Sequence, residues 1–486
     1  MSTRPGPDIG LRPTPLPYRG PSESPRPIEE VLDRHRVGLL TFTASVLAFV
    51  FGIALPLLGY RLNADPHRLF KVIAGGAIFS VFVARPTWVP YFLCLIFPFA
   101  NWLPKSPVPL LNSMNLLVVA AVFGIFAMTL RHKIRPIVPG MLNAPYFAFL
   151  FLAAFSVLTG SFLWPDRGGG GPERLRSFWN VLAGLLVYVT TTHLIVDRKQ
   201  VWRLVAFLII GSTIGVLGPI REVAAAGLGT RTGGGIGEIN RMGAFLAFTS
   251  VFAFSMLGAY GGLAKAATGV AGIITFAAMV FPNSRGAYIG FLLAAFPQAI
   301  RRSIVGTVLL IGLLGVGYLV APSFVKSRIT ETVQAGEGSD RVDSLDKTSG
   351  GRLTIWGRAF TVIKENPLIG VGWGNLQQAT GLTGGNFKHV HSLYLQTSGE
   401  MGLPALVVLF WLMITGWRMG GRLSRRGGKT AALGRAYQGV IICLMVSNLF
   451  GQRFLDFSLA GFFFTLSGCV ALEERFTRPE AMEERG

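Results

Sequence analysis

The chain has 486 residues, of which 51% are hydrophobic and 14% are charged, and its formal net charge is +21. Soluble domains carry about 25% charged residues, so this composition excludes an ordinary soluble enzyme and indicates an integral membrane protein. Nucleic-acid binding explains the positive charge poorly, because the basic residues are scattered between apolar segments and form no recognition motif. They fit topology signals better, together with groups that meet an anionic substrate at the membrane surface.

The start of the chain and its cysteines both argue against a secreted, disulfide-linked protein. The first 36 residues are polar and rich in Pro and Arg, which predicts a disordered cytoplasmic tail and no cleavable signal peptide. Cys94, Cys443 and Cys469 fall inside apolar segments without a CxxC spacing. We therefore expect packing cysteines, and neither a zinc site nor a disulfide framework.

The apolar residues fall in blocks of roughly 16 to 24, the length that crosses a hydrocarbon core of about 30 Å. We predict an all-α polytopic membrane protein with about 12–14 transmembrane helices and one long periplasmic loop that carries short helices. The predicted spans lie near 37–59, 69–84, 87–103, 109–130, 142–162, 177–196, 202–220, 242–261, 266–282, 286–300, 303–322, 402–417, 432–450 and 457–472. Prolines break the segment 87–103, which leaves a re-entrant path open.

The spans divide the chain into five parts. These are a cytoplasmic tail at 1–36, a helix bundle at 37–322, a periplasmic catalytic loop at 323–401, transmembrane helices at 402–472 and a cytoplasmic tail at 473–486. The orientation follows from Lys and Arg in short connections, which favour the cytoplasm. Placing the basic cluster 418–435 inside puts both termini in the cytoplasm and the loop 323–400 in the periplasm.

The outer side still holds more arginine than topology needs. These arginines are Arg61, Arg68, Arg167, Arg174, Arg176, Arg221, Arg231, Arg241, Arg285 and Arg453. A cluster of them facing one site would bind an anion, because a planar guanidinium group holds phosphate through two parallel hydrogen bonds. Arg285 stands at the outer mouth of an apolar hairpin, where an ionisable residue is a functional candidate; contact with lipid headgroups is the alternative.

The stretch 351–404 lies in the longest polar interval between apolar segments. Its apolar residues Leu353, Trp356, Phe360 and Ile363 recur at three- and four-residue spacing. This predicts a short helix with one apolar face, with Ser349 as its N-cap and Asn366 and Pro367 as its stop. Arg352 at the helix start opposes the helix dipole, which an anionic ligand would offset. Arg358 fits a solvated charge at the interface.

Three alternating glycines follow at 370–374 and permit a tight backbone path. Neither this run nor the glycine-rich segment 228–241 fits a nucleotide-binding loop, so no nucleotide cofactor is expected. His389 and His391 come next, and a third metal-type ligand is not obvious nearby. A general base that takes a proton from a hydroxyl is the favoured reading of this pair, and a histidine that caps the following helix is the alternative.

Several motifs together resemble the O-antigen ligase and polymerase superfamily. They are the INRMGAFLAF segment at 239–248, SRGA at 284–287, GR…W at 351–356, ENPLIGVGWGN at 365–375 and H-S-x-Y-L followed by GE-x-GLP at 391–404. The resemblance implies a metal-independent glycosyltransferase of the GT-C type in the bacterial inner membrane, without a cofactor. Such an enzyme moves a glycan from undecaprenyl pyrophosphate to a sugar hydroxyl of a glycan or glycolipid acceptor on the periplasmic side.

The resemblance also implies roles for individual residues. His391 corresponds to the residue that activates the acceptor hydroxyl, and Arg285 and Arg352 correspond to those that hold the pyrophosphate. We also expect Arg241 and Tyr394 to bind substrate. The chain departs from the family in Ser392, where Asn is common, and in having more predicted spans than usual.

The motifs leave the acceptor open. A ligase that uses lipid A core or a similar acceptor and a polymerase that extends a lipid-linked repeat unit both fit them. A transporter or flippase fits less well, because transporters place ionisable residues or broken helices near the midplane, whereas the spans here are nearly free of charge.

Overall fold

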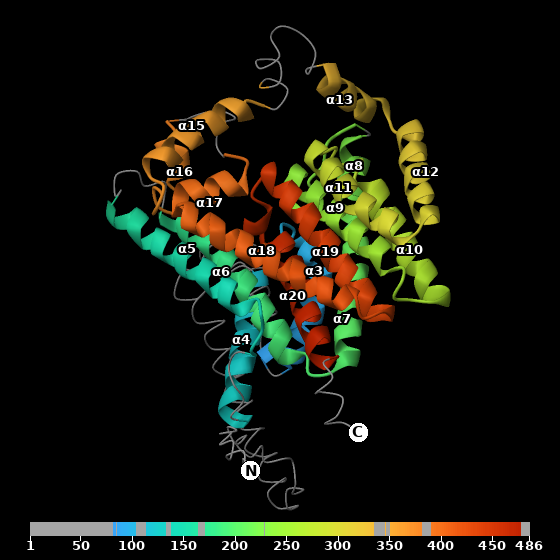
Figure 1. Ribbon diagram of the computed structural model, residues 1–486, viewed down its shortest axis with the longest axis horizontal. Helices are drawn as coiled ribbons and strands as arrows, with labels where there is room; N and C mark the ends of the chain where they lie inside the picture. The colour runs from blue at the N-terminus through green and yellow to red at the C-terminus, as the bar shows by residue number, and fades with distance from the viewer. Residues whose placement is uncertain are drawn as a thin grey trace, which may run out of the picture.

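The computed structural model describes residues 81–83, 85–103, 113–132, 138–163, 171–227, 229–334, 346, 350–381 and 390–477 (Figure 1). The described residues form helices joined by turns and contain no strand. The predicted span 37–59, most of the span 69–84 and the amino-terminal tail lie outside them. The predicted all-α fold is confirmed.

Six helical segments of the described residues are long and apolar enough to cross a membrane. They are α5 (Asn143–Leu163), α7 (Arg198–Ile214) continued by α8 (Leu217–Ala226), α9 (Ile239–Met256), α18 (Leu403–Ser424), α19 (Gly428–Leu449) and α20 (Phe457–Phe476). The other predicted spans correspond to α4 (Ser113–His132), α6 (Gly171–Leu194), α10 (Gly262–Ala278), α11 (Arg285–Arg302) and α12 (Ile304–Val320). The chain is therefore a multi-pass membrane protein.

The proline-containing segment 87–103 forms only short pieces. α3 (Val89–Ile96) is flanked by the 3₁₀ turns η1 (Pro86–Trp88) and η2 (Phe97–Phe99). Proline removes a backbone donor and limits the preceding residue, so a long uninterrupted helix does not form here. α3 packs against α7.

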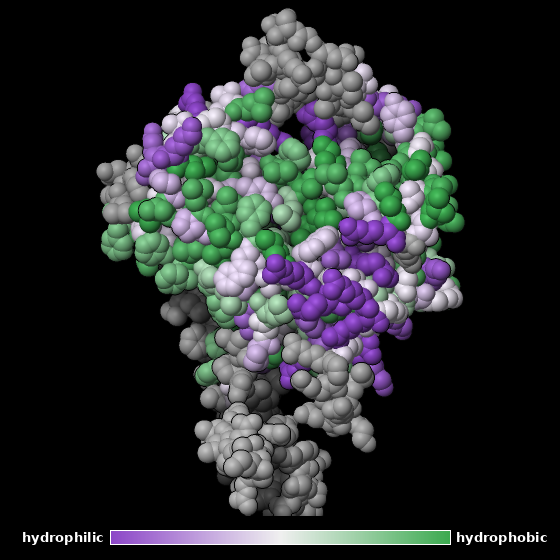
Figure 2. Space-filling model, viewed as in Figure 1, coloured by the Kyte–Doolittle hydropathy of each residue, from purple (hydrophilic) through white to green (hydrophobic). Residues whose placement is uncertain are grey.

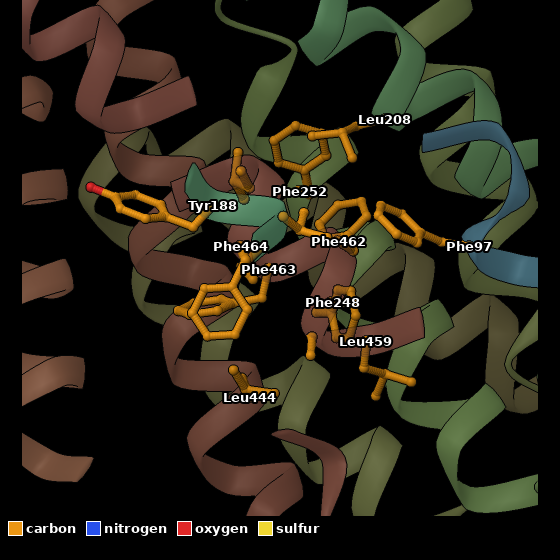
Figure 3. Packing of buried hydrophobic residues seen from close by; sticks show 14 of the residues in the cluster. Phe97, Tyr188, Leu208, Phe248, Phe252, Leu444, Leu459, Phe462, Phe463 and Phe464 are labelled. Atoms are coloured by element: carbon orange, nitrogen blue, oxygen red, sulfur yellow. The ribbon is translucent and has the colours of Figure 1, made fainter. Parts of the chain in front are cut away.

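The helix α20 lies at the centre of the bundle, and 94% of its most apolar 18-residue stretch is buried. A helix that is apolar all round is buried on every side, and the run FFF at 462–464 places large rings on several faces at once. Phe462 contacts Phe245, Phe248 and Phe252 of α9 at ring distances of 5.1–6.0 Å (Figure 3). α9 and α20 are thereby fixed to each other, which matters because both begin at the candidate site.

One end of the bundle carries the basic turns that were predicted to be cytoplasmic. Arg198 pairs with Glu473 at 2.7 Å and Arg422 pairs with Glu474 at 2.6 Å, which brings two of these turns to the end of α20. Polar residues gather over the lower parts of α18–α20, below an apolar band (Figure 2). The helices α13 (Ser323–Gln334) and α15 (Arg352–Glu365) lie at the opposite end (Figure 1).

Only part of the predicted apolar face of α15 packs against the protein. The helix buries Ile355, Ala359, Val362 and Ile363, whereas Leu353 and Phe360 are 40% and 53% exposed. The buried residues pack with Val371, Leu376, Val390 and Leu395, so the following loop and α17 (Leu393–Met401) decide which face is covered. Exposed apolar residues also satisfy the three- and four-residue spacing, and the spacing alone does not separate the two faces.

The carboxyl end of α15 matches the prediction, and the amino end does not. The helix stops at the predicted Asn366. The predicted N-cap Ser349 lies outside the described residues, and Gly351 with a φ of 78° occupies the N-cap position. The carboxylate of Asp346 accepts the N–H of Leu353 at 2.8 Å and that of Thr354 at 3.3 Å, which satisfies backbone donors of the first turn.

Candidate active site

Salt bridges join the first turn of α9 to the start of α20. The carboxylate of Glu238 accepts the backbone N–H of Asn240 at 2.9 Å and of Arg241 at 2.7 Å, and so caps α9. Arg241 in turn donates through Nη1 to Asp456 Oδ2 at 3.0 Å. Asp456 is the N-cap of α20 and accepts the N–H of Ser458. Arg241 is therefore held between two capped helix starts.

Arg453, in the connection between α19 and α20, lies inside the same network. Its Nη1 donates to Glu238 Oε2 at 3.0 Å and its Nη2 donates to the carbonyl of Phe450 at 3.4 Å, and only 7% of the side chain is exposed. Burial lowers the pKa of Arg453, and Glu238 opposes this effect. The charges of Arg241 and Arg352 lower the same pKa further, so Arg352 lies close enough to repel Arg453.

The electrostatics at Glu238 reflect the nearby cations. Burial acts to raise the pKa of Glu238, but Arg453 and the two capped N–H groups outweigh it, and the pKa is lowered. Glu238 is therefore ionised at neutral pH. Arg453 and Arg241 are paired with the carboxylates of Glu238 and Asp456, so the charges of these four side chains balance.

Arg285 is the first residue of α11, and this helix start lies beside α9 and Phe450. Ser284 Oγ donates to Asn240 Oδ1 at 3.2 Å. Gly286 faces Phe450 so closely that a Cβ there would lie 3.1 Å from the ring. Phe450 thus contacts the SRGA turn with its side chain and Arg453 with its carbonyl, which links the two arginine-bearing segments through one residue.

His391 precedes α17 in a backbone conformation that few residues adopt. Its φ is 51°, in the left-handed region, where His is enriched relative to bulky residues but still pays a steric cost. Asn283, directly before the SRGA turn, has a φ of 45°, and no other non-glycine residue among those described has a positive φ. Such outliers cluster at functional sites. Here each immediately precedes a helix start that carries a predicted site residue.

Tyr394 fixes α17 in place. Its hydroxyl donates to the carbonyl of Met445 on α19 at 2.7 Å, and its ring stacks on Phe410 of α18 at 5.5 Å. Burial raises the pKa of Tyr394 well above the usual value, so the hydroxyl stays protonated. Met445 is five residues before Phe450, about 7 Å along α19, so α17 approaches the same end of the bundle as Arg453. The hydroxyl of Tyr394 is engaged by protein, and its predicted contact with substrate stays a prediction.

The glycine run takes the predicted tight path. Gly370, Gly372 and Gly374 have φ values of 66°, 87° and 77°. A Cβ on Gly372 would lie 2.2 Å from the Cα of Gly160 on α5, so the two backbones touch. Backbone hydrogen bonds then join the loop to the end of α17, from Val371 N–H to the carbonyl of Gly399 at 2.8 Å and from Gly372 N–H to that of Glu400 at 3.0 Å.

Polar side chains secure this loop to α6. Trp373 donates through Nε1 to Ser177 Oγ at 2.7 Å, and Arg174 donates to Asn375 Oδ1 at 2.5 Å. Glu400 is buried beneath the loop, where Gln396 donates to its carboxylate. Burial raises the pKa of Glu400 to about 7, against the opposing effects of Gly374 N–H, Gln396 and Arg174.

The structure thus brings Arg241 and Arg453 into one charged network at the starts of α9 and α20, with Arg352 within electrostatic reach of Arg453. The start of α11 lies beside this network, and α17 approaches the same end of the bundle. His389 lies outside the described residues. Among the residues described, no three His, Cys, Asp or Glu side chains gather as metal ligands. Sequence reasoning placed Arg453 on the outer side without assigning it to the site and missed Glu238 and Asp456. Each of these acidic residues stands directly before an apolar span, a signal that identifies helix caps.

One part of the chain is similar to a known family. Residues 270–410 match the family model described as O-antigen ligase. The matched region contains Arg285, Arg352, His391 and Tyr394, whereas Arg241 and Arg453 lie outside it. No curated protein matches the chain. The match supports, in general terms, a function of the O-antigen ligase type.

Proposed function

We propose that this protein is a glycosyltransferase of the O-antigen ligase type, which transfers a glycan from undecaprenyl pyrophosphate to a sugar hydroxyl of lipid A core or a similar acceptor. The reaction takes place at the periplasmic face of the bacterial inner membrane and uses no metal ion. The observation that carries the proposal is the grouping of Arg241 and Arg453 at the starts of α9 and α20, with Arg352 within electrostatic reach of Arg453 and the start of α11 beside them. A pyrophosphate needs such fixed cations in a poorly hydrated site.

The support for individual roles is geometric. Arg352 lies within electrostatic reach of Arg453, and Arg453 contacts the carbonyl of Phe450, whose ring lies against the turn of Arg285. We assign Arg285 and Arg352 to the pyrophosphate, with Arg241 holding the same region together through Asp456. The left-handed backbone of His391 orients its ring from the start of α17.

In the proposed reaction His391 accepts the proton of the acceptor hydroxyl as its oxygen attacks the anomeric carbon of the donor glycan. The bond between that carbon and the pyrophosphate oxygen breaks, and both bonding electrons leave with the pyrophosphate. Arg285 and Arg352 stabilise the charge that develops there. His391 then releases its proton to water. General bases typically contribute about 10²–10⁴-fold to such rates.

A polymerase that extends a lipid-linked repeat unit uses the same donor chemistry and differs only in its acceptor. The experiment that tests the proposal reconstitutes the purified protein with glycan-loaded undecaprenyl pyrophosphate. One arm supplies lipid A core, and the other supplies a second lipid-linked repeat unit. Gel shift of the lipid A core supports the ligase, and a ladder of longer lipid-linked chains supports the polymerase. Absence of transfer to either acceptor, with His391 and both arginines intact, contradicts the proposed function.

A further inference from the structure

A groove between α3 and α7 lies away from the candidate active site, towards the end of the bundle where Arg198 pairs with Glu473. Its volume is about 800 Å³, within the range of ligand-binding pockets. Aromatic rings form much of its wall, and Arg203 is the charged residue among the lining side chains described. The rings are those of Phe82, Trp88, Tyr91, Phe92 and Phe207.

The α7 wall of the groove is ordered from charged to apolar along the helix. Arg203 and Phe207 line the groove four residues apart, and Lys199 lies four residues before Arg203 on the same face of α7, outside the lining residues. Each step moves about 6 Å along the axis. Both cations thus lie towards the basic end of the bundle, and Phe207 lies deeper. A ligand that matches this wall has an anionic head and an apolar tail.

Lys199 and Arg203 differ from the neighbouring arginines in whether a carboxylate binds them. Arg198 and Arg422 are bound to carboxylates of α20. Lys199 and Arg203 are exposed and form no hydrogen bond or ion pair within the part of the chain that the structure describes. The carboxylate beside them is Asp197, whose Oδ1 accepts the N–H of Gln200 at 2.7 Å as the cap of α7. Lys199 and Arg203 therefore have one neighbouring carboxylate, that of Asp197, and it is already hydrogen-bonded to the backbone as the cap of α7.

The α3 wall supplies exposed aromatic surface. Trp88 is 55% exposed and Phe92 is 39% exposed. The hydroxyl of Tyr91 donates to the carbonyl of Gln200 at 3.4 Å and so faces α7 rather than the lipid. Trp rings prefer the headgroup level of a bilayer, whereas Phe rings suit acyl chains. If free phosphate were the ligand, these aromatic rings would stay uncovered. If a neutral lipid were the ligand, the positive charge of Lys199 and Arg203 would stay uncompensated.

We propose that the groove between α3 and α7 binds an anionic phospholipid. Its phosphate lies against Arg203 and Lys199, and one acyl chain runs past Phe207 and Phe92. This site is separate from the arginine network that we assign to the donor. It takes a structural lipid of the leaflet that faces the basic end of the bundle, and it does not depend on the proposed transfer reaction.

The test uses the full-length protein, delipidated in detergent and titrated with phosphatidylglycerol, with retained lipid counted by native mass spectrometry. Phosphatidylcholine with the same chains and inorganic phosphate are the comparison ligands. We expect phosphatidylglycerol to be retained and to raise the melting temperature, and each cation removed to weaken its binding about fivefold. Arg203→Gln and Lys199→Gln remove the two cations. Arg418→Gln is the matched control, because Arg418 is also exposed near the basic end.

Two further variants separate lipid from other occupants. Leu95→Trp fills the groove while leaving both cations, and it must also reduce lipid retention. A photoreactive benzoyl-phenylalanine at Phe207 is expected to gain the mass of a phospholipid on irradiation. Equal retention of both lipids, a response to inorganic phosphate alone, unchanged binding in Arg203→Gln, or a crosslink to another part of the chain in place of lipid would overturn the proposal.

Discussion

Arg453 and Glu238 are 215 residues apart in sequence, and an ion pair of 3.0 Å joins them at the start of α9. Arg453 lies outside the region that matches the family model, and Glu238 caps the helix that carries Arg241. The pair therefore joins the start of α9 to the segment that leads into the last helix, on either side of the matched region in sequence. Substitution of Glu238 and Arg453 tests how far this network stabilises the fold while leaving Arg285, Arg352 and His391 in place.

Glu238→Gln leaves the buried guanidinium group of Arg453 without its carboxylate. We expect a loss of about 1.5–3 kcal/mol in unfolding free energy, the usual value of a hydrogen bond to a charged group. Thermal unfolding in detergent measures it. The double variant Glu238→Gln with Arg453→Gln should recover part of the loss, because no buried charge then lacks a partner. Strictly additive losses would mean that the pair is not coupled.

Arg285→Ala and Arg352→Ala should each strongly reduce glycan transfer. Each removes a charge-assisted contact with pyrophosphate worth about 1.5–3 kcal/mol, which is roughly 10- to 150-fold in donor binding or rate. Lys at either position should rescue activity only in part, because it cannot form two parallel hydrogen bonds. Arg358→Ala is the matched control, since Arg358 is exposed on the same helix as Arg352. Full activity of Arg285→Ala at matched expression would exclude it from the donor site.

His391→Ala should abolish transfer, while the protein still accumulates in the membrane and still binds donor lipid. Loss of a general base typically costs about 10²–10⁴-fold in rate. His389→Ala should remain substantially active. The measurement compares glycan on the acceptor by gel at equal protein levels. An inactive His389→Ala beside an active His391→Ala would move the base two residues upstream.

Glu400 predicts a dependence of stability on pH. Its pKa is raised by burial to about 7 in the folded protein, above its ordinary value of 4.5. The folded state therefore binds more protons than the unfolded state between these values, and this contribution to stability is lost as the pH rises from about 4.5 to 7. Melting temperatures across this range should fall less steeply in Glu400→Gln than in the native chain. Identical profiles would show that Glu400 does not titrate in this range.

The orientation of the chain can be tested with alkaline phosphatase fusions. We expect activity for a fusion at Gly338, in the predicted periplasmic loop, and none for a fusion at Gly427, in the basic turn between α18 and α19. The expectation follows from the Lys and Arg of the short connections. Activity with the opposite pattern would invert the proposed topology and move the arginine network to the cytoplasmic face.

The sequence predicts the helices well, because a long apolar segment in a membrane must satisfy its own backbone hydrogen bonds, and a helix does this within one segment. It also predicts the start of α11 at Arg285, where a charge interrupts the apolar run, and the tight path of Gly370, Gly372 and Gly374. The pairing of Arg453 with Glu238 was out of reach, since it depends on how α9 packs against α20. The face of α15 that packs against protein depends on tertiary contacts in the same way: Val390 and Leu395 lie against it, and local periodicity does not select it.

The contact between Gly372 and Gly160 limits how freely evolution or an engineer can exchange parts of this protein. The loop that bears Gly372 belongs to the matched region, whereas Gly160 belongs to α5, more than a hundred residues before that region begins. Any side chain on either glycine drives the two backbones apart and pulls the loop away from Glu400. A chimera that imports this loop from another protein must therefore also import the segment that takes the place of α5 there. The substrate specificity of such hybrids will then depend on the loop and α5 together, and not on the loop alone.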